Sequence, residues 1–246
     1  MTRVLVNGAK GRMGSMTALS VKADPSLTLV GETDLGDNLV QTIKDNRAEV
    51  VVDFTVASAG FDCFTTIVEA GAHPVVGTSG FNQEQVEKLK QLCRKKGIGG
   101  LIAPNFSIGG VLMMKFAAEA AKYMPDVEII ESHHEHKLDA PSGTAVRTAE
   151  MISDAAGSKS ITPDKSKELI AGVRGGRSND VPIHSVRLPG FLAQQRVIFG
   201  SLGQTLTLEH NSINRESFMS GVCLAIKKIV GQKELFYGLE ELLFRD

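Results

Sequence analysis

The feature that most constrains the fold of this chain is an alternation that fills about its first hundred residues. Short runs rich in valine, isoleucine and leucine alternate with stretches whose apolar residues recur at helical spacing, such as Phe61, Phe64 and Ile67. The runs lie at 3–7, 27–31, 50–54, 74–77 and 101–103. Continuous apolar runs that alternate with helices are typical of parallel strands covered on both faces. This part of the chain therefore predicts a doubly wound α/β unit.

The second half of the chain has a different pattern. We expect a helix over 111–123, a strand over 127–133, a helix beginning near Ser142, a long Gly/Ser/Asp-rich loop over 157–180, strands over 183–188, 195–199 and 205–210, and a helix over 215–230. Consecutive strands without intervening helices, joined by glycine turns, indicate an antiparallel or mixed sheet. The sequence therefore predicts a smaller α+β unit with a mixed sheet.

Composition and charge exclude several classes of function. The net charge of −1 gives no sign of binding to nucleic acid or to an anionic membrane. No apolar run approaches the roughly 20 residues of a membrane span, and the N-terminus enters a predicted strand without a signal segment. Cys63, Cys93 and Cys223 are far apart, which predicts buried thiols in a reducing compartment. We therefore expect a soluble cytoplasmic protein.

A glycine-rich turn follows the first predicted strand and opens a helix. It reads GAKGRMG and runs from Gly8 to Gly14. This spacing allows a tight turn, a close approach of the backbone to a pyrophosphate, and phosphates at a helix N-terminus. Asp34 lies just past the second predicted strand, where an acid accepts hydrogen bonds from ribose hydroxyls. The turn predicts a Rossmann-like dinucleotide site, unless the glycines only turn the chain and Asp34 is a surface acid.

The charges around this turn bear on the choice of dinucleotide. An acid at Asp34 repels a 2′-phosphate, whereas Lys10 and Arg12 in the turn attract one. Position 35, next to the acid, is a leucine and supplies no guanidinium. We therefore expect NADH to be preferred and NADPH to be tolerated.

Two further loops follow the fourth and fifth predicted strands. They comprise Gly77, Thr78 and Ser79 in the first, and Ala103, Pro104, Asn105 and Phe106 in the second. Ligands of an open α/β sheet bind at the carboxyl ends of its strands. We expect these loops to hold the nicotinamide end of the cofactor, with Phe106 against the ring, although ordinary strand-to-helix turns would look the same.

Proton-active side chains are concentrated in the middle of the chain, over 131–145. His133, His134, His136 and Lys137 precede a Pro-Ser-Gly-Thr turn. If the strand stays extended to Lys137, His134 and His136 share one face, and His133, Glu135 and Lys137 share the other.

The turn that follows is expected to bind an anion. Ser142 is a good helix N-cap, and the N–H groups of Gly143 and Thr144 then point out of the helix start. Together with His134 or Lys137, these groups would compensate a carboxylate. A histidine exchanges a proton near neutral pH, and a desolvated lysine can act as an acid.

Other interpretations of this cluster stay open. The HHxH pattern could hold a metal in a hydrolase, although the lysine opposes a cation and no second His/Cys cluster completes a shell, so we expect no metal. The histidines could be structural. A nucleotide-binding sensor without turnover is a further alternative.

Several motifs together resemble the dihydrodipicolinate reductase family. They are GAKGRMG, DFT at 53–55, GTSGF, APNFS and ExHHEHKLDAPSGTA, in this order over essentially the whole chain. The resemblance implies a dinucleotide-binding domain at 1–106 plus 213–246, completed by the C-terminal helix. It also implies a domain at 107–212 that binds substrate and builds a homotetramer. The implied activity is reduction of a cyclic unsaturated imine dicarboxylate to tetrahydrodipicolinate, by hydride transfer from NAD(P)H followed by protonation.

The resemblance also implies roles for individual residues. His133 matches the catalytic histidine and Lys137 the proton donor, although the residues themselves do not decide which delivers the proton. Substrate contacts are implied at His134, Ser142, Gly143 and Thr144. Cofactor contacts are implied at Gly8, Ala9, Lys10, Gly11, Arg12, Met13, Asp34, Gly77, Thr78, Ser79, Ala103, Pro104, Asn105 and Phe106. Leu35 departs from the arginine that members using NADPH often carry, and His136 receives no role.

Overall fold

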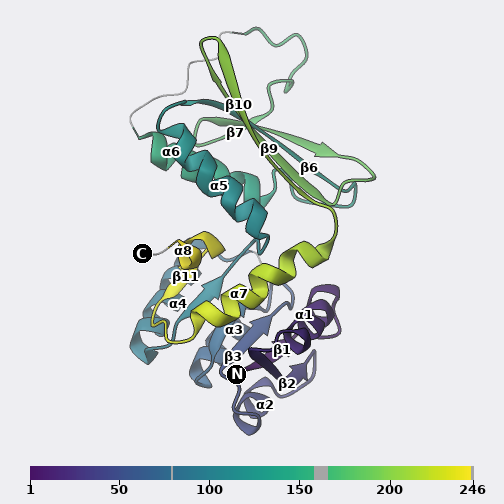
Figure 1. The fold of residues 1–246 in the computed structure, drawn as a ribbon, viewed down its shortest axis with the longest axis vertical. Helices are drawn as coiled ribbons and strands as arrows, with labels where there is room; N and C mark the ends of the chain where they lie inside the picture. Colours follow the sequence, from purple (N-terminus) through teal and green to yellow (C-terminus); the bar gives the residue numbers. More distant parts are fainter. Residues whose placement is uncertain (79, 158–165, 245–246) are drawn as a thin grey trace. The chain divides into compact units, whose positions relative to one another are not determined.

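The computed structural model describes residues 1–78, 80–157 and 166–244 (Figure 1). The chain divides into two compact units, Met1–Ser107 with Arg215–Asp246, and Ile108–Asn214. The predicted domain boundaries are close to this division. The second domain was predicted to begin at residue 107 and begins at Ile108, and the return to the first domain was predicted at residue 213 and occurs at Arg215.

The first unit is built on a six-stranded sheet in the order β11-β5-β4-β3-β1-β2. All of its strand pairs are parallel. The strands are β1 Thr2–Asn7, β2 Leu27–Thr33, β3 Val50–Asp53, β4 His73–Val76, β5 Gly100–Ile102 and β11 Leu235–Tyr237. The chain builds outward from β1 in both directions, to β2 on one side and to β3 on the other, and ligands of such sheets bind at this switch point. The predicted doubly wound parallel sheet is confirmed.

Helices cover both faces of this sheet (Figure 1). They are α1 Arg12–Ala23, α2 Leu39–Asp45, α3 Gly60–Glu69, α4 Gln83–Lys96, the 3-10 helix η1 Arg215–Phe218, α7 Met219–Ile229 and α8 Leu239–Leu243. Successive strand residues point to opposite faces, so Leu5 packs with Ile43 of α2 and Ile67 of α3, whereas Val6 packs with Ala18 of α1. The alternating residues of one strand thus anchor helices on both sides.

The second unit contains a five-stranded sheet in the order β10-β9-β6-β8-β7. The strands are β6 Asp126–His133, β7 Gly176–Ser178, β8 Val181–Arg187, β9 Ala193–Ser201 and β10 Gln204–Ser212. The β6–β8 pair is parallel and the other pairs are antiparallel, which confirms the predicted mixed sheet. Two helices, α5 Ile108–Ala121 and α6 Gly143–Ala156, pack against each other and against the sheet.

The structure corrects three sequence predictions. The strand β6 ends at His133, and the N–H of Lys137 donates to the His134 carbonyl at 3.1 Å, so a turn replaces the extended run predicted to Lys137. The loop predicted at 157–180 ends in the short strand β7, and residues 158–165 lie outside the described part of the chain. The C-terminal region, predicted as a helix alone, also supplies β11 at the edge of the parallel sheet.

Two findings bear on the predicted cellular context. In the part of the chain that the structure describes, no helix has the length and apolarity needed to cross a membrane. The cysteines are free thiols, but only Cys93 is fully buried, whereas Cys63 and Cys223 are half-buried, so the prediction of three buried thiols is wrong for two of them.

Candidate active site

The glycine turn of the first unit is packed too tightly to accept side chains. Gly8 has a φ of 78°, and a Cβ there would lie 2.9 Å from the carbonyl carbon and oxygen of Phe54. A Cβ on Gly14 would lie 2.1 Å from the Gly8 carbonyl oxygen. The N–H groups of Gly8 and Ala9 both donate to the Thr33 carbonyl, at 2.8 and 3.1 Å. The turn is therefore pinned between β1, β2 and the start of α1.

The N-terminus of α1 has the properties of an anion site. Gly11 is the N-cap and provides no side-chain cap, and no acidic residue lies in the first turn, which begins with Arg12 and Met13. The first N–H groups of a helix have no carbonyl partner within it, and the helix dipole favours negative charge there. The predicted turn residues therefore fit the pyrophosphate of a dinucleotide.

Asp34, the predicted ribose contact, is held against this turn. Its Oδ2 accepts from the N–H of Lys10 at 2.8 Å, and its Oδ1 accepts from the N–H of Leu35 at 2.8 Å. Hydrogen bonds from the Leu35 and Lys10 backbones lower the pKa of Asp34. An anion thus stands beside the turn, and the neighbouring Leu35 side chain is 98% exposed. A carboxylate at this position accepts hydrogen bonds and repels other anions.

The loops after β4 and β5 meet around Phe54, for which the sequence predicted no role. A Cβ on Gly77 would lie 2.1 Å from Cε1 of Phe54, so only glycine fits beside this ring. The ring of Phe106 packs edge-on against Phe54, with centroids 5.7 Å apart. Phe106 is 3% exposed, and its predicted contact with a nicotinamide ring stays a prediction.

The other residues of these two loops lie at the strand ends. Thr78 donates from Oγ1 to the Thr55 carbonyl at 3.4 Å, and the N–H of Ala103 donates to the Val76 carbonyl at 2.9 Å. Pro104 is exposed, and Asn105 accepts at Oδ1 from the N–H of Ser107 at 2.8 Å. Ser79, also predicted as a contact, lies outside the described residues.

Buried polar side chains join the ends of three strands below these loops. Asn7 donates from Nδ2 to Asp53 Oδ1 at 2.6 Å and accepts at Oδ1 from Thr33 at 2.9 Å, while Thr55 donates to Asp53 Oδ2 at 2.9 Å. Burial raises the pKa of the fully buried Asp53. This network was not predicted from the sequence. A polar residue at the end of each of the three strands β1, β2 and β3 is the signal that could have revealed it.

The proton-active residues of the second unit cluster at the carboxyl end of β6. His133 Nδ1 lies 2.5 Å from Glu131 Oε2. Arg187 of β8 donates from Nη1 to Glu131 Oε2 at 3.0 Å and from Nη2 to Oε1 at 2.8 Å. Although burial opposes it, these hydrogen bonds from His133 and Arg187 lower the pKa of Glu131 to about 2. Glu131 and Arg187 had no assigned role in the sequence analysis.

Lys137 is tied into the same group of residues. Its Nζ donates to both carboxylate oxygens of Asp139, at 2.7 and 2.8 Å, and the side chain is 21% exposed. Although partial burial opposes it, the hydrogen bond from Lys137 lowers the pKa of Asp139. Arg187 Nη2 also donates to the Asp139 carbonyl at 2.7 Å. One guanidinium thus connects the surroundings of His133 with those of Lys137.

The start of α6 matches the predicted anion-binding turn. The Ser142 side chain accepts from the N–H of Ala145 at 3.2 Å, which confirms the N-cap. Gly143 is exposed, and a Cβ there would meet no atom within 4 Å, so a ligand has room to approach. Thr144 follows in the first turn and is half-buried.

His134 and His136 lie on the turn that follows β6. Their ring centroids are 6.3 Å apart, and the side chain of His136 is 85% exposed. Within the described ranges, no group of three or more His, Cys, Asp or Glu side chains is arranged to hold a metal ion.

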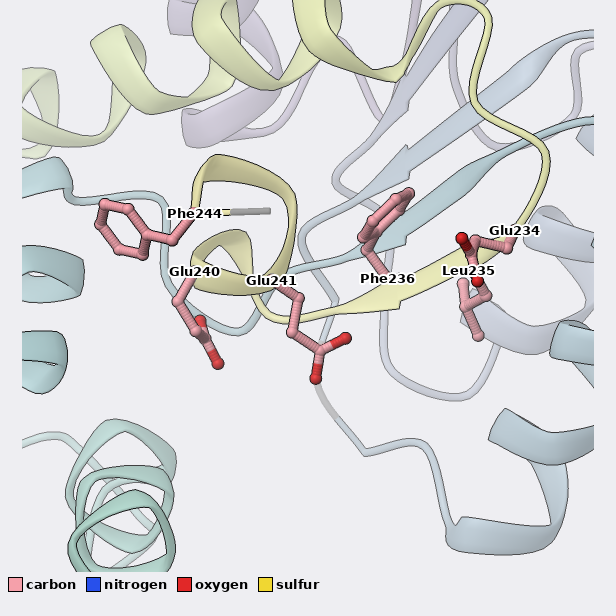
Figure 2. A pocket seen from close by; sticks show the side chains of 6 residues that line it. All are labelled: Glu234, Leu235, Phe236, Glu240, Glu241 and Phe244. Atoms are coloured by element: carbon pink, nitrogen blue, oxygen red, sulfur yellow. The ribbon is translucent and has the colours of Figure 1, made fainter. Parts of the chain in front are cut away.

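A separate hollow of about 290 Å³ in the first unit contains none of the predicted residues (Figure 2). Its lining comes from β11, α8 and the residues beside them: Glu234, Leu235, Phe236, Glu240, Glu241 and Phe244. Glu241 accepts from the N–H of Tyr237 at 3.1 Å, which ties α8 to β11. This hollow belongs to the C-terminal packing of the sheet.

The low pKa of Glu131 predicts a pH-dependent contribution to stability. Because the folded-state pKa of about 2 lies below the ordinary value of 4.5, the ionised carboxylate stabilises the fold above pH 4.5. That contribution is lost as the pH falls from about 4.5 to about 2. Over this interval, the difference in free energy of unfolding between wild type and Glu131→Gln should narrow. Urea unfolding at a series of pH values measures it, and a pH-independent difference would contradict the assignment.

A doubly wound sheet with a glycine turn at its switch point, joined to a unit that carries acid–base side chains, defines the class of Rossmann-like oxidoreductases. Within that class, two protein-family models match the chain. Residues 2–106 match "Dihydrodipicolinate reductase, N-terminus" and residues 109–243 match "Dihydrodipicolinate reductase, C-terminus". The chain belongs to the dihydrodipicolinate reductase family.

Individual relatives agree with this assignment along the whole chain. A Legionella pneumophila (strain Lens) protein named 4-hydroxy-tetrahydrodipicolinate reductase is 50% identical, over 98% of this chain and 99% of that protein. A Coxiella burnetii (strain Dugway 5J108-111) protein of the same name is 47% identical, over 98% of each. The solved structure of dipicolinate-bound dihydrodipicolinate reductase from Paenisporosarcina sp. TG-14 has a TM-score of 0.88 and 41% identity, over 99% of this chain and 100% of that chain.

Proposed function

We propose that this protein reduces 4-hydroxy-tetrahydrodipicolinate in the lysine and diaminopimelate pathway. The substrate, NAD(P)H and a proton give tetrahydrodipicolinate, NAD(P)⁺ and water. The observation that carries the proposal is the cluster of His133 and Lys137 in the short segment between β6 and the N-terminus of α6, in a chain whose two halves both match the family. Such a site combines a proton source with groups that bind carboxylates.

The cofactor end of the site is assigned to the first unit. The turn Gly8–Met13 would hold the pyrophosphate, and Asp34 the adenosine ribose. The nicotinamide end would meet Gly77, Thr78 and the backbone of Ala103–Phe106. When bound, the reduced nicotinamide supplies the hydride. The residues of the protein fix its position, which supplies much of the rate through proximity.

The substrate end is assigned to the second unit. The N–H groups of Gly143 and Thr144 and the hydroxyl of Ser142 would bind one carboxylate of the substrate, with His134 as a further contact. A hydroxyl that accepts from Ala145 can still donate its own proton. Lys137 or His133 then delivers the proton that completes the reduction.

We also propose a homotetramer in the cytoplasm, as the family resemblance implies. The edge strand β10 leaves Leu206 partly exposed, and the turn before it leaves Leu202 fully exposed, which supports association through the mixed sheet. The three free thiols fit a reducing compartment. Light scattering of the purified protein measures the assembly, and a monomer at micromolar concentration would contradict this part of the proposal.

The proposal predicts a change in cofactor preference for one substitution. Leu35→Arg should shift the ratio of kcat/KM for NADPH over NADH upward by roughly tenfold, because a guanidinium beside Asp34 would pair with the 2′-phosphate. Initial rates with both cofactors measure this ratio. Leu169→Arg, which adds the same charge at a 90% exposed position of the other unit, is the matched control. An unchanged ratio would show that the 2′-phosphate is recognised elsewhere.

The central test is oxidation of NADH by the purified protein in the presence of freshly generated substrate. We expect turnover that a chelator leaves unchanged, with tetrahydrodipicolinate identified by mass spectrometry. Binding of NADH without turnover would instead indicate a sensor. Turnover abolished by the chelator would indicate a metal-dependent enzyme.

A further inference from the structure

We infer that Glu131, held by two hydrogen bonds from Arg187, is a positioning residue that fixes the tautomer and orientation of His133. Through Arg187 it also links His133 to Lys137. This inference rests on the proposed function, because it assigns no new reaction and concerns how the proposed proton-transfer residues are held. It adds to the site two side chains that the motif leaves without a role.

The sheet geometry explains why these side chains meet. Residues at i and i+2 of a strand point to the same face, so Glu131 and His133 share one face of β6. In the parallel pair with β8, Glu131 lies opposite Ser185 and His133 lies opposite Arg187. Ser185 and Arg187 therefore share that face of the sheet, and both donate hydrogen bonds to Glu131.

The contact with Glu131 decides which nitrogen of His133 remains for chemistry. An ionised carboxylate only accepts hydrogen bonds, so the proton of a neutral His133 must lie on Nδ1, 2.5 Å from Glu131 Oε2. Nε2 is then the nitrogen left to exchange a proton with the substrate. The Glu131 side chain is fully buried and the His133 side chain is 15% exposed, so the carboxylate is shielded while the ring reaches the surface.

Arg187 is held for more than this one pair. Its two Nη atoms donate hydrogen bonds to both carboxylate oxygens of Glu131 and to the backbone carbonyl of Asp139. The carboxylate of Asp139 in turn accepts from Lys137 Nζ. Its Nε is buried and, among the described residues, has no hydrogen-bond partner. A buried ion pair contributes little net stability once desolvation is counted, and an unpaired buried donor costs more. A contribution to the stability of the fold therefore does not by itself explain why Arg187 is placed here.

A second group of the same three residue types lies on the opposite face of the same strand. Glu128 accepts from His184 Nε2 at 2.8 Å and pairs with Arg174. Its side chain is 36% exposed, and within the described part of the chain it makes no hydrogen bond or ion pair with His133 or Lys137. Glu128 is therefore a matched control for a carboxylate held between an arginine and a histidine.

The test compares Glu131→Gln with Glu128→Gln. Glutamine keeps the shape of the side chain and removes the charge. Glu131→Gln should lower kcat on the order of tenfold or more, because part of a general acid–base contribution of about 10²- to 10⁴-fold is lost. The KM for substrate and the Kd for NADH should stay close to wild type, since neither ligand is proposed to touch Glu131. Glu128→Gln should leave kcat unchanged.

A spectroscopic readout separates positioning from general stability. Nitrogen NMR of histidine-labelled protein, with the signal of His133 assigned through His133→Gln, reports the ring tautomer. We expect the Nδ1–H form in the wild type and a mixture in Glu131→Gln. Arg187→Lys removes the bidentate hydrogen bond to Glu131 while keeping the positive charge, and it should lower kcat with little change in KM. This second variant carries the test if Glu131→Gln does not fold.

The outcomes distinguish the inference from the proposed function. If the wild type does not turn over the substrate, the proposed function fails. If the wild type is active and His133→Gln is inactive, but Glu131→Gln and Arg187→Lys keep the wild-type kcat, the proposed function stands and the positioning role is wrong. An equal loss in Glu128→Gln and Glu131→Gln would also overturn the positioning role, because the effect would then belong to the sheet as a whole.

Discussion

Replacing Lys137 with alanine is expected to lower kcat by about 10²- to 10⁴-fold, while the affinity for NADH stays unchanged. Lys137 Nζ is held by both oxygens of Asp139, and its side chain is 21% exposed, so it is fixed in place and still reachable. The residues assigned to the cofactor belong to the other unit. Steady-state rates and NADH titration by fluorescence measure the two quantities.

Lys122→Ala is the control for Lys137→Ala. Lys122 Nζ binds both carboxylate oxygens of Glu119, at 2.8 and 2.9 Å, so a similar lysine–carboxylate pair is removed from the surface of the same unit. Its turnover should match the wild type. Lys137→Arg sharpens the assignment, because arginine keeps the charge but does not release a proton. Restored turnover in Lys137→Arg would make Lys137 a carboxylate clamp, and loss of NADH affinity in Lys137→Ala would make it a cofactor residue.

The second large effect is expected for Gly14→Ala. The new Cβ would lie 2.1 Å from the Gly8 carbonyl oxygen and 2.7 Å from its carbonyl carbon, and both are backbone atoms that cannot swing aside. The turn between β1 and α1 must therefore open. We expect the free energy of unfolding to fall by about 1 to 3 kcal/mol or more. We also expect NADH affinity to fall by at least about tenfold, which corresponds to about 1.4 kcal/mol.

A graded series tests the geometric reason for this effect. A Cβ on Gly11 would lie 3.2 Å from the same oxygen, so Gly11→Ala should have a smaller effect on both quantities than Gly14→Ala. Gly200→Ala is the control, because a Cβ there meets no atom within 4 Å. Urea unfolding and NADH titration measure the series. Wild-type stability and affinity in Gly14→Ala would contradict the steric reason for this glycine.

Much of the fold follows from local pattern, and the exceptions have local causes. The valine-rich runs at 50–54 and 74–77 are buried strands of the parallel sheet, as predicted. The strand β11 has only three residues, too few to show a period, and it forms because its edge position beside β5 pairs its backbone. The strand β7 is equally short and forms only through its pairing with β8.

The candidate site divides in the same way. Ser142 and Gly8–Gly14 are recognisable because caps and tight turns depend on neighbouring residues. Arg187 is separated from Glu131 by 56 positions and reaches it only through the β6–β8 register, which no local pattern encodes. The predicted alternation of faces at 134–137 is wrong because a turn closes after His133. How the roles divide between His133 and Lys137 stays a prediction for the variants above.

The parallel sheet of the first unit takes its edge strand β11 from the end of the chain, beside β5. During synthesis, β5 therefore emerges before its partner strand β11, and one of its edges stays unpaired until all of Ile108–Asn214 has been made. The intervening unit is one continuous segment and can fold on the ribosome before its host is finished. During that interval the unpaired edge of β5 can pair with a wrong strand. The order of translation thus allows the inserted unit to fold first, whereas the parallel sheet of the surrounding unit is completed only when β11 has been made.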